Sequence, residues 1–221
     1  INTDATLDLA DAARAAGISR FVNLSSIKAL TGAFDGPPLD EAATPAPDDA
    51  YGRSKLAADR GLAERDLDWV SLRPVLVYGP GVKANMAALL RLARLPLPLP
   101  LGGLSAPRSL LAVENLAEAV AFALTPVSPP RRSYIVSDPE TISVAEMIAA
   151  MRAGLGRRPG LIPLPAGWMG ALAQLAGRNE AFAKLSGGLV ARPEALLRAG
   201  WRPPVATKAA LARMAAPAGD V

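Results

Sequence analysis

Tyr51 and Lys55 are the two side chains whose types and spacing most clearly suggest chemistry. Residues four apart on a helix share a face, so the phenol and the ammonium would stand about one turn apart. A phenol ordinarily titrates near pH ~10, and a neighbouring ammonium favours the phenolate by direct charge attraction. Such a pair could exchange a proton with a substrate hydroxyl or carbonyl. The same spacing also fits an exposed tyrosine and lysine on a solvated helix, so the pair alone is weak evidence.

The composition excludes several other kinds of catalysis and partner. The 221 residues include no histidine and no cysteine. Ser-His-Asp and Cys-His catalysis, disulfides and His/Cys zinc sites are therefore ruled out, and we expect no metal site. The net charge of +4 comes with arginines scattered along the chain, so we expect no nucleic-acid partner. Because no apolar run reaches the roughly eighteen residues of a membrane span, we also expect no membrane partner and a cytoplasmic protein.

Strand and helix patterns alternate along the chain, which predicts an α/β fold with a parallel sheet. The apolar run over 20–26 predicts a buried strand that ends in Ser25 and Ser26. A polar loop then leads to the helix that carries Tyr51 and Lys55. A second strand is predicted over 69–81, with a bulge or an end at Pro74, because proline cannot donate to a sheet. Further helices are predicted over 3–16, 51–65, 85–94, 114–124, 144–153, 168–176 and 193–199, and strands over 108–113 and 133–136.

Several further segments match the motifs of one enzyme superfamily in the same order. Asn2-Thr3-Asp4-Ala5-Thr6 is similar to its Asn-x-x-Gly-Thr, and the strand ending at Ser26 is similar to the one that delivers an active-site serine. Segments 72–81, 108–117 and 199–203 match a cofactor-side strand, a substrate-binding segment and a closing Gly-Trp-x-Pro. With Tyr51-x-x-x-Lys55 among them, the chain resembles the extended short-chain dehydrogenase/reductase superfamily, of the NAD-dependent epimerase/dehydratase type.

The resemblance implies a Rossmann-like parallel sheet, N-terminally truncated, with a smaller C-terminal substrate-binding lobe. Residues 1–81 and 107–137 would form the partial dinucleotide-binding domain, and residues 82–106 and 138–221 the substrate-binding lobe. The implied cofactor is NAD or NADP. A glycine-rich loop between a strand and a helix, which would hold the pyrophosphate, does not occur in these residues. We therefore expect this chain by itself to bind the cofactor poorly.

The resemblance also implies a role for each site residue. The implied catalytic set is Ser26, Tyr51 and Lys55, with Ser25 as the alternative serine. The implied cofactor-binding residues are Asn2, Tyr51, Lys55 and Pro74. The implied substrate-binding residues are Ser26, Asn85 and Arg108, because a guanidinium suits the diphosphate of a nucleotide sugar.

Three functions follow as hypotheses from the resemblance. The first is an NAD(P)-dependent epimerase or reductase that acts on a UDP-hexose-type nucleotide sugar. The second is a 3β-hydroxysteroid-dehydrogenase-like or dihydroflavonol-reductase-like oxidoreductase, in keeping with Leu76 where nucleotide-sugar enzymes often carry asparagine. The third is a non-catalytic family member, against which the presence of Ser26, Tyr51 and Lys55 argues. Family members often pair through two helices, so we also expect a homodimer through the helix that starts at Tyr51.

Overall fold

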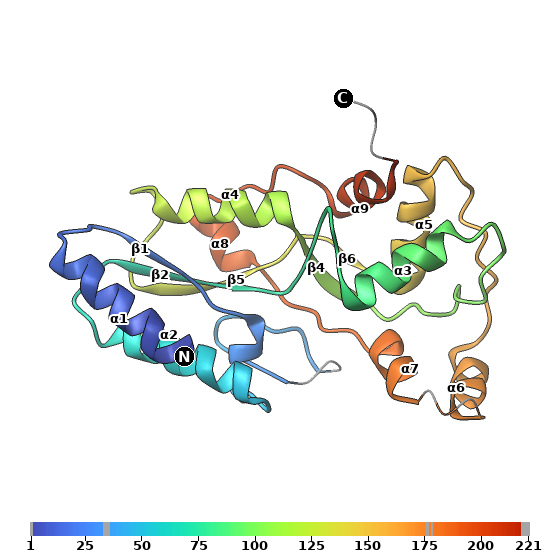
Figure 1. Ribbon diagram of the computed structural model, residues 1–221, viewed down its shortest axis with the longest axis horizontal. Coiled ribbons are helices and arrows are strands. Elements are labelled where there is room, and N and C mark those ends of the chain that lie inside the picture. Colours follow the sequence, from blue (N-terminus) through green and yellow to red (C-terminus); the bar gives the residue numbers. More distant parts are fainter. Residues whose placement is uncertain (1, 33–35, 176, 178, 218–221) are drawn as a thin grey trace.

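Two short sheets form the frame of the molecule in the computed structural model, which describes residues 2–32, 36–175, 177 and 179–217 (Figure 1). The first sheet has the strand order β1-β2-β5, and both of its pairs are parallel. The second has the order β3-β4-β6, in which β3 and β4 are parallel and β6 is antiparallel to β4. The predicted α/β class with a parallel sheet is thus confirmed. The strands are β1 (Phe21–Leu24), β2 (Trp69–Pro74), β3 (Leu76–Tyr78), β4 (Arg108–Ala112), β5 (Arg132–Val136) and β6 (Thr141–Ile142).

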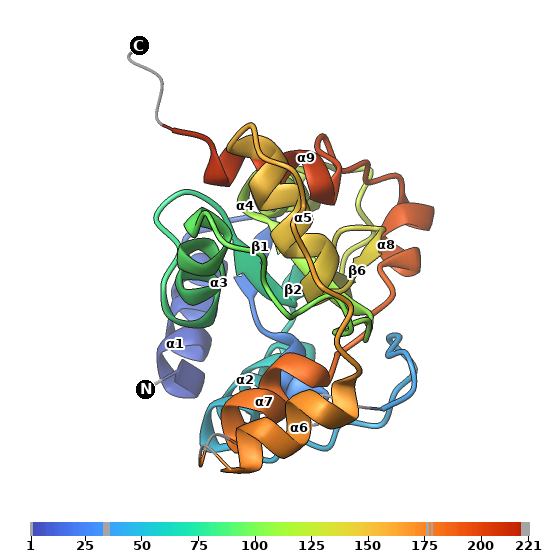
Figure 2. The same cartoon turned by 90° about the vertical axis from the view of Figure 1, so that its right-hand side faces the viewer.

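Helices cover both faces of the first sheet. Figure 1 shows α1 and α2 on one face and α4 and α8 on the other. Figure 2 shows α3, α5 and α9 gathered together; with the second sheet they form what we call the second half of the molecule, and the first sheet with its helices forms the first half. No helix among the described residues is long and apolar enough to cross a membrane. The helices are α1 (Asn2–Ala15), the short 3₁₀ helix η1 (Ile27–Ala29), α2 (Ala50–Ala63), α3 (Ala84–Arg94), α4 (Val113–Leu124), α5 (Val144–Gly154), α6 (Ala166–Leu175), α7 (Asn179–Ser186), α8 (Glu194–Ala199) and α9 (Thr207–Ala215).

Pro74 ends β2 and sends the chain from the first sheet to the second. The single strand predicted over 69–81 is therefore two strands, β2 and β3, and the prediction of a strand end at Pro74 was correct. Proline has no N–H to continue the ladder, and the next residue, Val75, donates its N–H to the carbonyl of Val136 (3.1 Å). This crossing leaves the carboxyl end of β2 open toward the second half of the molecule.

A small apolar cluster packs α1 and α2 against the first sheet, and its members are Ala10, Leu62, Leu67 and Trp69. Two larger apolar cores stabilise the two halves of the molecule. One lies between the first sheet and the helices α4 and α8, and the other lies among α3, α5, α9 and the second sheet. Ala191, Leu196 and Trp201 pack in the first core, although they fall within the segment assigned above to the substrate-binding lobe. The division into a dinucleotide-binding part and a substrate-binding lobe stays a prediction.

A buried carboxylate joins the second sheet to its helices. Asp138 accepts hydrogen bonds from the backbone N–H of Ala112 (3.1 Å), the Asn115 amide (2.7 Å), the Tyr78 hydroxyl (3.1 Å) and the Thr207 hydroxyl (3.2 Å). Burial raises the pKa of Asp138 above its usual value, and the hydrogen bonds partly oppose this shift. These bonds hold the ends of β3 and β4 against α4 and α9.

The start of α2 lies unusually close to the turn that follows β1. Asp49 caps the helix by accepting a hydrogen bond from the N–H of Gly52 (2.6 Å), and it pairs with the Lys28 ammonium (3.3 Å). The hydrogen bond from Gly52, and after it the contact with Lys28, lower the pKa of the Asp49 carboxyl. A Cβ on Gly52 would overlap the carbonyl oxygen of Lys28, so glycine is needed for this close approach.

We expect Gly52→Ala to lower the free energy of unfolding by about 1–3 kcal/mol, the usual cost of forcing an extra carbon into a packed site. Urea denaturation of both proteins measures this loss. The control is Gly167→Ala in α6, where a Cβ would meet no heavy atom within 4 Å among the described residues. Because alanine favours helix, this variant should be at least as stable as the parent protein. Equal stability of Gly52→Ala and the parent would contradict the packing argument.

Candidate functional site

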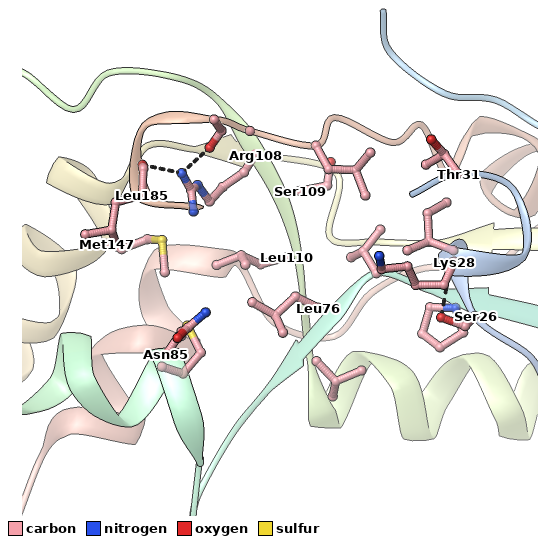
Figure 3. A pocket seen from close by; sticks show the side chains of 18 of the residues that line it. Ser26, Lys28, Thr31, Leu76, Asn85, Arg108, Ser109, Leu110, Met147 and Leu185 are labelled. Carbon is pink, nitrogen blue, oxygen red and sulfur yellow. Dashed lines mark hydrogen bonds between the residues drawn. The ribbon is translucent and has the colours of Figure 1, made fainter. Parts of the chain in front are cut away.

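A cavity of about 470 Å³ lies between the carboxyl end of β2 and the second half of the molecule (Figure 3). Most of its wall is apolar, and most of its polar side chains lie toward its two ends, with Ser109 between them (Figure 3). Figure 3 shows Ser26, Lys28 and Thr31 at one end and Asn85 and Arg108 toward the other. Concave, mostly apolar sites with a few placed polar groups are typical of small-molecule binding. Four of the predicted site residues line the cavity, and these are Ser26, Pro74, Asn85 and Arg108.

The two serines after β1 face different surroundings. The Ser26 hydroxyl lies in the cavity wall, where its oxygen accepts a hydrogen bond from the N–H of Lys28 (3.2 Å) and caps η1. The Ser25 hydroxyl points the other way and donates to the carboxylate of Asp59 (3.0 Å). Successive side chains of an extended segment point to opposite sides, which explains the difference. Of the two, Ser26 is the one placed to meet a ligand in the cavity.

The Tyr–Lys pair lies at the same strand end, next to the cavity wall rather than in it. The Lys55 ammonium donates to the carbonyl of Leu24 (2.9 Å), the last residue of β1, and stands 5.9 Å from the centre of the Tyr51 ring. The Tyr51 side chain is about half exposed at 48%. Because Leu24 lies only two residues before Ser26, the hydrogen bond to its carbonyl holds the Lys55 ammonium close to the segment that bears Ser26. The structure thus brings the predicted catalytic side chains to one end of one strand.

Asn2 and Pro74 approach this strand end from different elements. Asn2 begins α1, and its amide donates to the hydroxyl of Ser54 on α2 (3.3 Å), away from the cavity wall. Pro74 ends β2 and lines the cavity. Asn2 therefore contacts the helix that carries Tyr51, whereas Pro74 faces the cavity directly.

Arg108 and Asn85 belong to the other end of the cavity. Arg108 is the first residue of β4, and its guanidinium donates to the carbonyls of Leu185 (2.7 Å), in the last turn of α7, and of Gly187, just after that helix (Figure 3). Burial lowers the pKa of this guanidinium from its usual value. Asn85, in the first turn of α3, is exposed. An elongated ligand with a hydroxyl at one end and an acidic group at the other would match this distribution of polar groups.

Sequence reasoning did not single out Lys28 or Asp59. Lys28 lines the cavity next to Ser26 and forms ion pairs with Asp49 and, at 3.9 Å, Asp48. Its position two residues after Ser26 is the sequence feature that could have marked Lys28 as a site residue. Asp59 is a buried residue of α2. Its spacing of four from Lys55, which places both on one helix face, is the pattern that could have pointed to it.

The comparisons with known proteins agree with this architecture. A sequence profile of the NAD dependent epimerase/dehydratase family matches residues 1–137, which is more than half of the chain. The UDP-glucose 4-epimerase of Vibrio cholerae is 33% identical over 213 residues, which cover 92% of this chain and 64% of that protein. The chain thus spans somewhat less than two thirds of the length of this relative.

Two solved structures illustrate the likeness of the fold. The UDP-glucose 4-epimerase of Thermus thermophilus, solved in complex with NAD, is 26% identical with a TM-score of 0.66, and the match covers 97% of this chain and 68% of that one. The UDP-N-acetylglucosamine 4-epimerase of Bacillus cereus is 22% identical with a TM-score of 0.72, and the match covers 95% and 70%. These neighbours agree with the fold, and the profile match over residues 1–137 confirms the resemblance seen in the sequence: the chain belongs to the NAD dependent epimerase/dehydratase family.

Proposed function

We propose that the protein containing this chain is an NAD(P)-dependent epimerase or reductase that acts on a UDP-hexose-type nucleotide sugar. The observation that carries the proposal is a cavity with Ser26 at one end and Arg108 toward the other, beside the Tyr51–Lys55 pair. The activity of the Vibrio cholerae relative, a UDP-glucose 4-epimerase, supports the same substrate class. Turnover of UDP-glucose or UDP-galactose, followed by the anomeric proton signals in NMR spectra, tests the proposal.

The residues at the ends of β1 and β2 fit a nicotinamide cofactor, NAD or NADP. Open α/β sheets bind dinucleotides outside the carboxyl ends of their strands, which is where Lys55 and Pro74 stand. Leu24, which ends β1, and Leu76, which begins β3 just after the end of β2, are exposed (47% and 53%) and offer apolar contact surface for a planar ring. We assign ribose binding to Tyr51 and Lys55, with Pro74 and Asn2 as further cofactor-side residues. The bound cofactor supplies the group that accepts and returns a hydride.

This chain's own residues handle the proton. Tyr51 takes the proton from the substrate hydroxyl as that carbon is oxidised and returns it when the carbonyl is reduced. Lys55 stabilises the phenolate by charge. Ser26 donates to the same substrate oxygen and stabilises the charge that develops on it. Ser26 is assigned this role in preference to Ser25, because the Ser25 hydroxyl already donates to Asp59.

Arg108 and Asn85 bind the nucleotide end of the substrate in this proposal. The Arg108 guanidinium now donates to two backbone carbonyls, and a diphosphate would offer it charged oxygens instead. A phosphate oxygen adds the attraction between opposite charges, which a neutral carbonyl lacks, so the diphosphate would be the stronger acceptor. The fork of a guanidinium also matches the geometry of a phosphate group.

One observation supports a second candidate function. The cavity wall is mostly apolar and includes Leu76, which suits a hydrophobic alcohol such as a steroid or a flavonoid. A hydroxysteroid-dehydrogenase-like or dihydroflavonol-reductase-like enzyme would use Ser26, Tyr51 and Lys55 in the same way. It would need no cation for a diphosphate, so its activity would not depend on the charge of Arg108.

Replacing Tyr51 with phenylalanine removes the proposed proton-transfer group and little else. We expect Tyr51→Phe to lower kcat for UDP-hexose by about 10²–10⁴-fold while KM changes little. The matched control is Tyr134→Phe in β5, a buried tyrosine outside the cavity wall, which should keep the parent activity. Full activity of Tyr51→Phe would refute its assignment as the base.

Replacing Arg108 tests the substrate class. We expect Arg108→Met to raise KM for a UDP-hexose at least tenfold, because the diphosphate loses its cationic partner. Arg132→Met, which removes an exposed arginine of β5, should leave KM within twofold. Steady-state kinetics measure both values. Unchanged KM for the UDP-sugar in Arg108→Met, together with turnover of a steroid or flavonoid alcohol, would favour the second candidate.

We propose that two copies of the protein pair through α2 and its neighbour α1. The two helices lie side by side on one face of the first sheet, and Leu9 on α1 is 62% exposed (Figure 1). Light scattering should give twice the mass of one copy, and Leu9→Arg should shift the mass toward a monomer. A monomer mass for the parent protein at micromolar concentration would exclude this dimer.

A further inference from the structure

The helix that carries Tyr51 and Lys55 also carries a buried carboxylate on the side that faces the sheet. Asp59 is 4% exposed and stands on α2, one turn after Lys55 and two turns after Tyr51. Because residues four apart share a helix face, all three side chains lie on one side of α2. Tyr51 and Lys55 occupy the end of this face near the cavity, and Asp59 occupies the part that packs on the sheet.

Four donors from two strands meet the Asp59 carboxylate. One oxygen accepts from the Asn23 amide (3.2 Å) and the Ser71 hydroxyl (2.5 Å). The other accepts from the Ser25 hydroxyl (3.0 Å) and the Arg73 guanidinium (2.9 Å). Asn23 and Ser71 are directly paired in the register of β1 and β2, so the four donors form one patch on the face of the sheet. We call these five residues the Asp59 cluster.

The Asp59 cluster is continuous with the proposed catalytic groups. Leu24, Ser25 and Ser26 are consecutive, and each has a different task. The carbonyl of Leu24 accepts from Lys55, the hydroxyl of Ser25 donates to Asp59, and Ser26 lines the cavity. Two bonds from successive turns of α2 therefore attach the helix to the segment that bears Ser26.

We propose that Asp59 is a positioning residue that sets the distance between Tyr51 and Lys55 on α2 and Ser26 after β1. The proposal rests on the proposed function above, because it gives the cluster a role in that reaction. Loss of the carboxylate would free α2 to shift along the sheet, and a shift of about 1 Å at reacting groups can lower a rate by about 10²-fold. Substrate binding would be spared, because Arg108 and Asn85 stand on β4 and α3 in the other half of the molecule.

Two variants separate positioning from stability. Asp59→Asn keeps the shape but leaves the buried Arg73 without its carboxylate, so it also weakens the fold. The double variant Asp59→Leu/Arg73→Met removes both charges together, and Asn23 and Ser71 keep their mutual hydrogen bond (2.9 Å), so it should cost less stability than a variant that leaves one buried charge unpaired. The control is Asp11→Asn, which breaks the ion pair with Arg65 (2.8 Å) just beyond the far end of α2. Thermal unfolding identifies which variants are folded at the assay temperature.

Steady-state kinetics with UDP-hexose then test the proposal. We expect the folded double variant to lose at least tenfold in kcat with KM within threefold, and Asp11→Asn to keep both values within twofold. A folded double variant with the parent kcat would overturn the proposal. So would a variant whose defect lies in KM alone, because the cluster would then serve substrate binding.

A second readout does not depend on activity. The rate of reductive methylation of Lys55, measured by peptide mass spectrometry, should rise at least threefold in the double variant, because the ammonium loses its fixed contact with Leu24. Lys83, an exposed lysine next to α3, is the internal reference and should not change. Absence of UDP-hexose turnover by the whole protein that contains this chain would defeat the proposed function, whereas an unchanged Lys55 rate would defeat the positioning role.

Discussion

The Asp59 carboxylate, buried between α2 and the first sheet, is the interaction on which the arrangement of the site depends. Breaking a buried ion pair by removing one partner typically costs about 3–5 kcal/mol, because the remaining charge stays buried. Here the carboxylate has four donors from β1 and β2, so both of its oxygens are fully used. Sliding α2 by a turn would take the carboxylate away from all four donors, although the Asn23 amide would keep its bond to the Ser71 hydroxyl (2.9 Å), and this cost gives the helix one strongly favoured position.

The cavity depends on a second constraint, the crossing of the chain at Pro74. Because β2 must end there, the chain passes into β3, and the two halves meet with an opening at the ends of β1 and β2. One half supplies Ser26, and the other supplies Arg108 and Asn85. The Asp59 cluster stabilises the first half and the bonds to Asp138 stabilise the second. Because Asp138 also bonds Asn115 on α4, which covers the first sheet, the two halves are tied together, and the cavity between them can hold reacting groups and binding groups in fixed relation.

Local patterns were enough to predict the helix that carries Tyr51 and Lys55, the strand that ends at the serines, and the α/β class. They did not predict α7, which packs on the preceding helix α6, or α9, an alanine-rich segment that packs on α5, or the two-residue strand β6. The choice between Ser25 and Ser26 was also beyond local reasoning. It depends on Asp59, which lies 34 residues away from Ser25 and reaches it across the interface between helix and sheet. Such contacts are set by tertiary packing, which a single sequence does not display.

Amide hydrogen exchange tests most directly whether the buried carboxylate holds α2 and β1 together. In the parent protein, the amides in the middle of α2 and those of β1 should open with the same free energy, as parts of one cooperative unit. In Asp59→Asn, exchange in both elements should become at least tenfold faster, while α5 and α9 in the second core keep their protection. Unchanged protection of α2 in that variant would contradict the account.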